Sequence, residues 1–237
     1  MPDISVVIPC YNEEAVIERS YRRVKAALDR QPGKHEILIA NDGSKDRSAE
    51  ILLSLASQDP SLVFISYQPN RGMGHACRKM YERASRDIVI QMDADLAMDP
   101  VDTIPAFARE LCAVDCVVGS RYVGIKADYP WRRRIASHGY YAINKFLFDF
   151  SLRDTQSGFF GIRRQILQSL PMHSDGFEIH VEMFALLEKR GHSIREIPIR
   201  FVHQTESGEV SVFKSAPKML MGSLRIWKSL RQARPGA

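Results

Sequence analysis

The chain lacks the features that define several common protein classes. Its four cysteines form no CxxC pair and its seven histidines do not cluster with them, which argues against a zinc site. It contains no run of 18 or more apolar residues, so no membrane-spanning helix is expected. No secretory signal is recognised at the N-terminus, and reduced, buried thiols in a cytoplasmic setting are therefore expected.

Glycine-rich phosphate-binding motifs are also missing, because neither GxGxxG nor GxxxxGK[ST] occurs. This disfavours a dinucleotide-binding or P-loop protein. The net charge of +5 is unevenly spread, since the chain from Val210 onward carries six Lys and Arg and no Asp or Glu. A basic tail on a nearly neutral body, without a base-reading motif, does not indicate a nucleic-acid partner.

Hydrophobic periodicity alternates regularly in the first half of the chain. Short apolar, β-branched runs predict strands at 4–10, 35–42, 62–68, 87–93 and 116–122. Helical spacing of apolar residues predicts helices between them at 12–31, 44–58, 74–85 and 101–113. Ser44 is the N-cap candidate of the second of these helices. Continuous apolar strands between amphipathic helices indicate a mostly parallel sheet covered on both faces. The predicted fold class is therefore α/β.

The second half is less regular but still predicts alternating elements. A basic, aromatic-rich helix at 130–150 precedes a turn, strand and helix at 155–167, a helix at 176–192 and a strand at 193–204. A mobile loop is expected at 205–211 and a basic amphipathic helix at 214–234. We expect one domain at 1–213 followed by this C-terminal helix and tail at 214–237.

Polar residues follow the predicted strands, where ligands of such folds bind. Asp93 and Asp95 end an apolar strand, and carboxylates near a core require a cation, a ligand that carries one, or solvent at the strand end. Residues at alternate strand positions point to opposite faces, so the two carboxylates are expected to do different jobs.

Six motifs occur together in one order: "VVIPCYNEE" (6–14), "NDGSKDRS" (41–48), "MDADL" (92–96), "GSRY" (119–122), "QSGFFGIRR" (156–164) and "GFEIHVEM" (176–183). With them the chain resembles family 2 glycosyltransferases, which have the Rossmann-like GT-A fold, up to about residue 230. Within that family it is most similar to dolichol-phosphate mannose synthases and related polyprenyl-phosphate glycosyltransferases.

The resemblance implies a nucleotide-sugar donor bound over the first half. Asp95 would ligate Mg²⁺ or Mn²⁺ at the diphosphate, and this metal would offset charge on the leaving group. Five residues would line the donor pocket: Pro9, Tyr11, Glu13, Asp42 and Asp93.

The resemblance also implies that Arg121, Arg133 and Ser137 clamp the phosphate of a lipid acceptor, with both arginines and Asp95 as catalytic residues. Guanidinium groups match phosphate oxygens well. An anionic phosphate needs no general base, and the product would be β-linked from an α-linked donor. A hydroxyl acceptor would need a base instead, for which Glu178 and Glu182 are the nearest candidates by motif order, although helix-surface or supporting roles are equally consistent.

Two places depart from the family pattern. Ala97 and Met98 stand where relatives often carry polar residues that help the metal, which leaves Asp99 as an alternative ligand. In the loop before the last helix the expected Arg is absent, and His203 or Lys214 would replace it.

The leading hypothesis is an inverting, metal-dependent hexose transfer to a polyprenyl (dolichyl) phosphate, with GDP-mannose favoured as donor and UDP-glucose next. Transfer to a saccharide or other hydroxyl compound, and a non-catalytic nucleotide-sugar-binding protein, stay open. The basic C-terminal helix predicts a peripheral position at the cytoplasmic face of a membrane or a helix docked on the domain. A membrane-anchored partner subunit is also left open.

Overall fold

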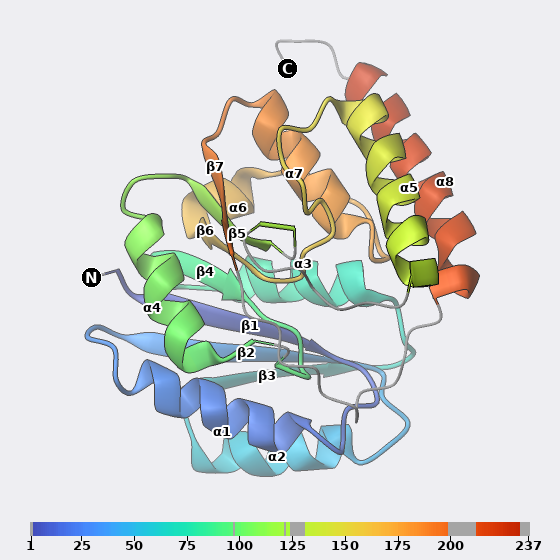
Figure 1. The fold of residues 1–237 in the computed structure, drawn as a ribbon. Coiled ribbons are helices and arrows are strands. Elements are labelled where there is room, and N and C mark those ends of the chain that lie inside the picture. The colour runs from blue at the N-terminus through green and yellow to red at the C-terminus, as the bar shows by residue number, and fades with distance from the viewer. Residues whose placement is uncertain (1, 97, 121, 124–130, 199–211, 233–237) are drawn as a thin grey trace.

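The computed structural model describes residues 2–96, 98–120, 122–123, 131–198 and 212–232, with the backbone alone described for 131–138 and 212–217. Helices and strands alternate along the chain (Figure 1). In order, the elements are β1 (Ile4–Cys10), α1 (Ile17–Leu28), β2 (His35–Asp42), α2 (Ser48–Gln58), β3 (Leu62–Tyr67), α3 (Met73–Arg83), β4 (Ile88–Gln91), α4 (Pro100–Glu110), β5 (Cys116–Ser120), α5 (Trp131–Phe148), β6 (Phe160–Arg163), α6 (Arg164–Ser169), α7 (Ile179–Lys189), β7 (Ile194–Pro198) and α8 (Val212–Gln232).

The strands of the described residues form one seven-stranded sheet in the order β3-β2-β1-β4-β6-β5-β7. β1 pairs in parallel with β2 and β4, β2 pairs in parallel with β3, and β5 with β7. Only β6 runs against its neighbours β4 and β5. The predicted mostly parallel α/β fold is therefore confirmed, and the antiparallel β6 carries the "FGIR" run that follows the predicted turn.

Both faces of the sheet are covered by helices, which explains why its strands are apolar without alternation. Val6 and Ile8 of β1 pack in one core with α1, α2 and α4, whereas Val7 between them packs in a second core with α3, α6 and α7. All three side chains are fully buried. The two cores hold β1 and β4 at the centre of the molecule (Figure 1).

The C-terminal helix α8 is docked on α5 and α7. Buried Ser223 lies 2.8 Å from the hydroxyl of Tyr140 on α5, and Lys189 of α7 donates to the carbonyl of Leu230. A Cβ on Gly222 would lie 2.7 Å from Cγ of Glu178, so glycine permits this close approach. The docking fits one of the two expected positions of this helix, and the division of the chain at 213/214 stays a prediction.

Candidate active site

The four parallel strands β1 to β4 end at one edge of the sheet, and the loops that follow them form the candidate donor site. These loops are 11–16, 43–47, 68–72 and 92–99. Parallel strands bring their carboxyl ends together, which is why ligands of open α/β sheets bind there. The predicted donor residues all lie at or just beyond these strand ends: Pro9, Tyr11, Glu13, Asp42, Asp93 and Asp95.

The loops after β1 and β2 are joined by reciprocal hydrogen bonds. The Asn12 N–H donates to Ser44 Oγ at 2.9 Å, and the Lys45 N–H donates to Asn12 Oδ1 at 2.8 Å. Asn12 has a φ of 56°, a left-handed conformation that asparagine tolerates better than most residues and that ends the extended strand. The Glu13 N–H donates to Ser48 Oγ at 2.9 Å. These bonds give the first two loops a single fixed geometry.

The same bonds correct two predicted helix starts. The first helix begins at Ile17, not at residue 12, because residues 12–15 form the turn just described. The prediction of Ser44 as an N-cap was wrong. α2 begins at Ser48, and the Ser44 hydroxyl accepts from the β1 loop instead of from its own helix.

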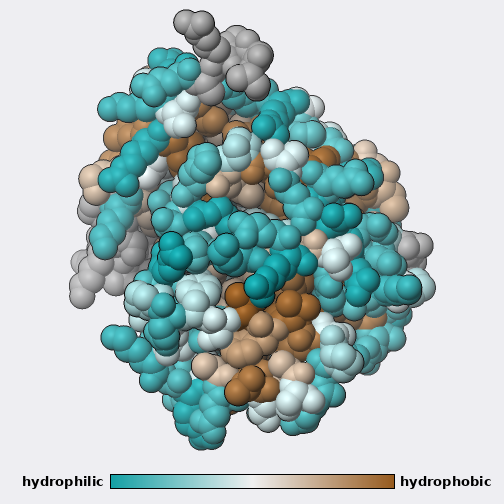
Figure 2. Space-filling view, turned by 180° about the vertical axis from the view of Figure 1, so that it is seen from behind, coloured by the Kyte–Doolittle hydropathy of each residue, from teal (hydrophilic) through white to brown (hydrophobic). Residues whose placement is uncertain are grey.

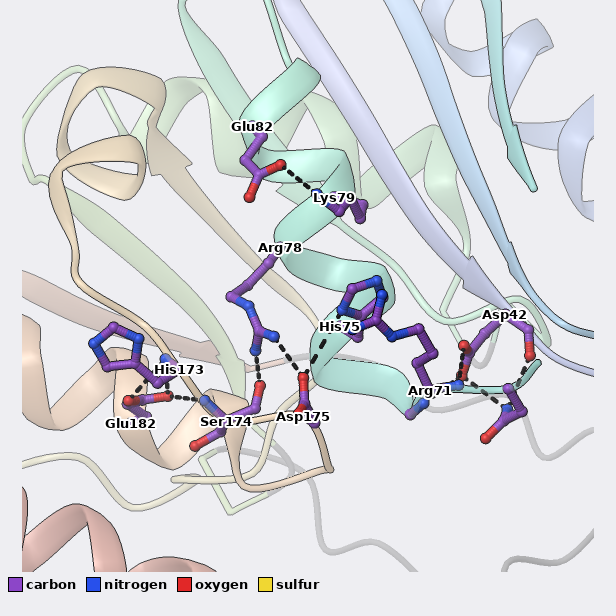
Figure 3. A network of polar contacts seen from close by, with 12 residues as sticks. Asp42, Arg71, His75, Arg78, Lys79, Glu82, His173, Ser174, Asp175 and Glu182 are labelled. Atoms are coloured by element: carbon purple, nitrogen blue, oxygen red, sulfur yellow. Dashed lines mark hydrogen bonds and ion pairs between the residues drawn. The ribbon is translucent and has the colours of Figure 1, made fainter. Parts of the chain in front are cut away.

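Asp42, at the end of β2, is 3% exposed and holds the β3–α3 loop. Its carboxylate accepts from the backbone N–H groups of Arg71 and Gly72, each at 2.8 Å, and from the Asn70 amide at 2.8 Å (Figure 3). Three donors satisfy the hydrogen-bonding capacity of this buried carboxylate without a cation. The structure thus assigns Asp42 a scaffolding contact, and its predicted contact with the nucleoside stays a prediction.

Asp93 and Asp95 lie beyond β4, which ends at Gln91, so they belong to a turn and not to the predicted strand end. The Leu96 N–H donates to the Asp93 carbonyl at 3.1 Å, which closes that turn. A Cβ on Gly158 would lie 2.7 Å from Asp93 Oδ1, so the Asp93 carboxylate lies against Gly158, two residues before β6. Both side chains are half-buried.

The Asp95 carboxylate instead lies near Glu13 on the β1 loop. The pKa of Glu13 is raised to about 7, first by burial of its carboxyl group and then by the negative charges of Asp95 and Asp46. Asp93 and Asp95 therefore have different neighbours, although a turn and not strand alternation separates them. Their predicted roles at the nucleoside and at the metal stay predictions. The neighbourhood of Asp95 is an acidic site that favours a cation.

Asp95 fits a metal ion whose coordination shell is completed by a bound substrate and water. It does not belong to a preformed site made of protein ligands alone. Within the described part of the chain, no group of three or more His, Cys, Asp or Glu side chains converges to hold a metal ion. Mg²⁺ is commonly held by one or two carboxylates together with substrate phosphates and water. One half-buried carboxylate with acidic neighbours matches that donor set.

The residues after Asp95 are used for packing and capping. Met98 is 1% exposed and packs in the first core, so it is unavailable to a metal. Asp99 caps α4 by accepting from the Val101 N–H at 3.1 Å, and it pairs with Arg23 at 2.9 Å. The predicted alternative role of Asp99 at the metal is disfavoured by these contacts. Ala97 lies outside the described residues.

The predicted acceptor residues lie largely outside the described part of the chain. Arg121 lies outside the described residues. For Arg133 and Ser137, which lie one turn apart on α5, only the backbone is described. The described neighbours nevertheless converge. Tyr122 lines a small pocket together with Tyr140 and Tyr141 of α5 and residues 153–156 before β6. The segment after β5 and the helix α5 therefore meet, as the acceptor hypothesis requires.

A polar network that the sequence did not predict joins the start of α3 to the loop before α7 (Figure 3). The Gly74 N–H donates to the Asp175 carbonyl at 2.8 Å, and Arg78 donates to the Ser174 carbonyl and to the Asp175 carboxylate. A Cβ on Gly74 would overlap the Ser174 carbonyl oxygen. The spacing Gly72-x-Gly74 at a helix start was the available signal, since two close glycines indicate a close backbone approach.

Glu182 completes this network from α7. It is 7% exposed and its carboxylate accepts from the His173 N–H at 3.0 Å and the Ser174 N–H at 2.8 Å. Glu178, the other candidate base, lies over Gly176 and Gly222. Both glutamates thus contact the backbone around the start of α7. The supporting role that the sequence left open for them is the one observed.

The pair α5 and α8 presents apolar side chains to solvent. Phe146 of α5 is 89% exposed and Met221 of α8 is 51% exposed, with Ile143 and Leu224 also exposed. Arg225 and Lys228 of α8 are exposed as well, and the Arg231 guanidinium lies 4.2 Å from the ring centroid of Trp227. Among the described helices, none combines the length and hydrophobicity needed to span a bilayer.

The fold and its acidic edge define the GT-A class of glycosyltransferases. Glucosyl-3-phosphoglycerate synthase from Mycobacterium tuberculosis, solved with Mn²⁺, UDP and phosphoglyceric acid, superposes with a TM-score of 0.72 over 99% of this chain and 80% of that one, at 18% identity. At that identity the similarity speaks for the fold alone.

The chain belongs to glycosyl transferase family 2, whose model matches residues 5–170. A dolichol-phosphate mannosyltransferase from Saccharomyces cerevisiae is 31% identical over 99% of this chain and 89% of that protein. One from Pyrococcus furiosus is 30% identical over 84% of this chain, which spans only 56% of that protein. A polyprenol monophosphomannose synthase from Mycolicibacterium smegmatis is 28% identical over 84% of this chain and 77% of its own length. The predicted family and enzyme class are confirmed.

Proposed function

We propose that the protein transfers a hexose from a nucleotide-sugar to a polyprenyl phosphate, with inversion at the anomeric carbon. The observation that carries this proposal is the state of Glu182. Both candidate bases near the motif "GFEIHVEM" contact the framework, and Glu182 already accepts two backbone N–H groups while 7% exposed. A hydroxyl acceptor requires a base, whereas a phosphate acceptor does not, so these contacts favour the phosphate.

In the proposed reaction, an anionic oxygen of the lipid phosphate attacks the anomeric carbon from the side opposite to the nucleotide. The bond from that carbon to the diphosphate oxygen breaks, and its electron pair leaves with the nucleoside diphosphate. An α-linked donor thereby gives a β-linked lipid-phosphate sugar. Arg121, Arg133 and Ser137 would hold the attacking phosphate, and rate enhancement would come from positioning and charge stabilisation.

The donor would lie on the acidic edge, with Pro9, Tyr11, Glu13, Asp42 and Asp93 around the nucleoside. GDP-mannose is the favoured donor because three relatives bear mannosyltransferase or phosphomannose synthase names. UDP-glucose comes next, because structures with this fold contain UDP or UDP-glucose. The 43% exposed ring of Tyr11, directly after β1, is well placed to pack on a base.

Asp95 would hold Mg²⁺ or Mn²⁺ together with the donor diphosphate. The bound cation would supply a Lewis acid that offsets charge on the departing diphosphate. It would also offset the charge of Asp95, which adds to the effect of burial in raising the pKa of Glu13. The use of Mn²⁺ in a glycosyltransferase of this fold supports the assignment.

The exposed apolar and basic side chains of α5 and α8 support a peripheral position at the cytoplasmic face of a membrane. Phe146 and Met221 would enter the interfacial region, and Arg225 and Lys228 would contact anionic headgroups. A membrane-anchored partner subunit would serve the same purpose and is a second proposal on the same surface.

The test is a transfer assay with purified protein, Mg²⁺ or Mn²⁺, labelled GDP-mannose or UDP-glucose, and a short polyprenyl phosphate in detergent. We expect an organic-extractable, mild-acid-labile lipid-phosphate sugar, formed with one preferred donor. Transfer to free saccharides but not to the lipid phosphate would contradict the proposal and favour the hydroxyl acceptor. Donor binding by calorimetry without transfer or hydrolysis would favour a non-catalytic protein.

A further inference from the structure

A polar cluster lies inside the apolar second core, near the turn that carries Asp93. Polar side chains cover most of the face shown in Figure 2, where water can satisfy them, but those inside the protein need partners of their own. We name this group the Gln91 cluster. It consists of Gln91 of β4, Cys77 and Tyr81 of α3, and His180 of α7. All four residues are at most 3% exposed.

The Gln91 amide is held in one orientation by its neighbours. Its Oε1 accepts from the Tyr81 hydroxyl and, at 3.5 Å, from the Cys77 thiol. Its Nε2 lies 2.7 Å from His180 Nε2. An amide nitrogen only donates, so His180 Nε2 accepts, and the imidazole is the neutral tautomer with its proton on Nδ1. The Gln91 cluster therefore fixes one amide orientation and one ring tautomer.

The cluster lies at the end of β4, directly before the turn that starts at Asp93. Gln91 is the last residue of β4 and pairs with Phe160 of the antiparallel β6. Continuing that register by two residues on each strand places Asp93 opposite Gly158, and the contact between these two residues agrees with it. Residues two apart on a strand point to the same face of the sheet. The Asp93 carboxylate therefore follows Gln91 on the face that the second core covers.

The electrostatic effect of Asp93 on the cluster agrees with that placement. Burial raises the pKa of the Cys77 thiol to about 12, and the negative charge of Asp93 contributes to the increase. Burial also raises the pKa of the Tyr81 hydroxyl, again with a contribution from Asp93. The Asp93 carboxylate is thus close enough to affect both residues that donate to Gln91, in an interior that screens charge less than water does.

His180 contacts both strands that flank Asp93. It bonds to Gln91 of β4, and its ring meets the Phe160 ring of β6 edge-on, with the centroids 6.0 Å apart. Phe160 also packs edge-on against Phe184, one turn further along α7. One side chain of α7 therefore contacts the strand that precedes Asp93 and the strand that follows Gly158.

Stability alone does not call for such a cluster. Burial of polar groups costs free energy that hydrogen bonds only offset, and apolar side chains of similar shape can fill the same space. A fully paired network instead holds the groups bonded to it in a single arrangement. We infer that His180 is a positioning residue of the donor site, which acts through Gln91 to hold the turn that begins at Asp93. This inference rests on the proposed donor role of Asp93.

The first test is calorimetry of GDP and of UDP binding with Mn²⁺, which needs no acceptor. In His180→Leu we expect the dissociation constant of the preferred nucleotide to rise by about tenfold or more, because the Gln91 amide loses its acceptor. His180→Gln keeps an acceptor near the position of Nε2 and should restore the affinity to within about threefold of the wild type. Tyr81→Phe removes one hydroxyl that fixes Gln91, should weaken binding in the same direction, and supplies the test if His180→Leu does not fold.

The matched control is Ser5→Ala, near the start of β1. It removes a buried hydrogen bond to Glu36, at 2.6 Å, from the opposite end of the sheet. Its nucleotide affinity should stay within about twofold of the wild type. A folded His180→Leu or Tyr81→Phe protein with the wild-type affinity would overturn the inference. So would a His180→Gln variant that binds no better than His180→Leu.

The transfer assay separates a positioning role from a loss of stability. In His180→Leu the KM for the nucleotide-sugar should rise, whereas kcat and the KM for polyprenyl phosphate should change by less than about twofold. Equal changes in both KM values would contradict the inference. A wild-type protein that binds the nucleotide but transfers nothing to the lipid phosphate would overturn the proposed function and leave the calorimetric result for His180 standing. A wild-type protein that binds neither nucleotide would overturn both.

The second test needs no ligand. The Leu96 N–H closes the turn by donating to the Asp93 carbonyl, so its hydrogen exchange reports how firmly the turn is held. We expect exchange at Leu96 to be about tenfold faster in His180→Leu than in the wild type. The Ser44 N–H, which donates to Asn41 Oδ1 at 3.2 Å, is the internal control and should not change. Unchanged exchange at Leu96, or equal acceleration at both sites, would show that His180 does not hold the turn.

Discussion

The donor edge and the α5–α8 pair are built on different physical principles. At the donor edge, side chains accept backbone N–H groups from neighbouring loops: Asp42 holds Arg71 and Gly72, and Ser44 holds Asn12. Between α5 and α8, the described side-chain hydrogen bonds come from one residue, Tyr140, which contacts Ser223 and the Met219 carbonyl, and the outer faces of both helices expose apolar side chains. One region fixes polar atoms in place, and the other presents an apolar surface.

The difference matches the two proposed substrates. A nucleotide diphosphate is small, polar and specific in shape, so its site benefits from loops that are already fixed before binding. A polyprenyl chain in a bilayer offers no fixed shape, so an apolar, basic surface is sufficient to meet it. Single-atom changes should therefore damage the donor edge, whereas the α5–α8 surface should respond in proportion to apolar area.

The largest effect is expected for Asp95→Asn at the donor edge. The change removes the one carboxylate proposed to hold the cation with the diphosphate, and we expect transfer to fall by about 1,000-fold or more. Calorimetry should show that Mn²⁺ no longer strengthens binding of the nucleoside diphosphate. The native melting temperature should be kept or raised, because Glu13 loses a negative neighbour.

The control for that prediction is Asp99→Asn, four residues further on. Asp99 caps α4 and pairs with Arg23. Asparagine keeps a capping oxygen and removes only the exposed ion pair, so the variant should lose no more than about 0.5 kcal/mol of stability and keep its transfer rate within about twofold. If Asp95→Asn retained transfer with undiminished metal dependence, Asp95 would have no role at the metal.

The next effect concerns the fixed geometry of the loops themselves. Asp42→Ala leaves the N–H groups of Arg71 and Gly72 without their acceptor, whereas the Asn70 amide keeps its bond to the carbonyl of residue 42. We expect a loss of about 3 kcal/mol in the free energy of unfolding. Urea unfolding followed by circular dichroism measures it.

Glu50→Ala, at an exposed site on α2, is the control for Asp42 and should change stability by less than about 0.5 kcal/mol. The conservative Asp42→Asn, studied for donor affinity, separates scaffolding from the predicted nucleoside contact. A folded Asp42→Asn protein with unchanged donor affinity would limit Asp42 to the scaffold.

The sequence predicted the fold class and the clustering of the donor residues because both depend on patterns that strands and helices impose directly. Continuous apolar strands indicated two covered faces, and parallel strand ends placed Glu13 and Asp95 at one edge. The prediction of Ser44 as an N-cap failed because the hydroxyl pairs with Asn12, which lies 32 residues earlier in the chain. Local propensity cannot report such a partner.

The network at α3 and α7 was missed for a related reason. Arg78 and Asp175 lie 97 positions apart, and nothing in either local sequence indicates that they meet. Glu182 illustrates the limit of motif order. Its place in "GFEIHVEM" left it open as a base, whereas its contacts with the backbone of His173 and Ser174 depend on how the preceding loop folds back.

The α5–α8 surface should respond to loss of apolar area. Phe146→Ser removes the most exposed large apolar side chain, 89% exposed, so the melting temperature should not change. Binding to vesicles with anionic lipid should weaken by about tenfold, which corresponds to the transfer energy of one aromatic side chain. Leu53→Ser on α2 removes an apolar side chain that is 64% exposed on another face and should leave vesicle binding unchanged. Equal vesicle binding by the Phe146 variant would move the membrane contact elsewhere.

The smallest expected effect is a pH dependence at His75, which links the donor edge to the loop before α7. Burial lowers the pKa of His75, and the charges of Arg71 and Arg78 lower it further, while Asp175 acts in the opposite direction. The folded state therefore binds fewer protons than the unfolded state just below the ordinary histidine pKa. The resulting stability is fully present above about pH 6.5 and is lost as the pH falls through the folded-state value.

Urea unfolding between pH 5 and pH 8 measures this dependence. His75→Gln should flatten the decline in the free energy of unfolding on the acid side. His173→Gln is the matched control, because His173 joins the network of Figure 3 through its backbone N–H and its side chain is not among the donors to Glu182. An unchanged slope in His75→Gln, or an equal change in both variants, would mean that acid sensitivity arises outside this link. A change in His75→Gln alone would assign the acid sensitivity to the contact between His75 on α3 and Asp175 in the loop before α7.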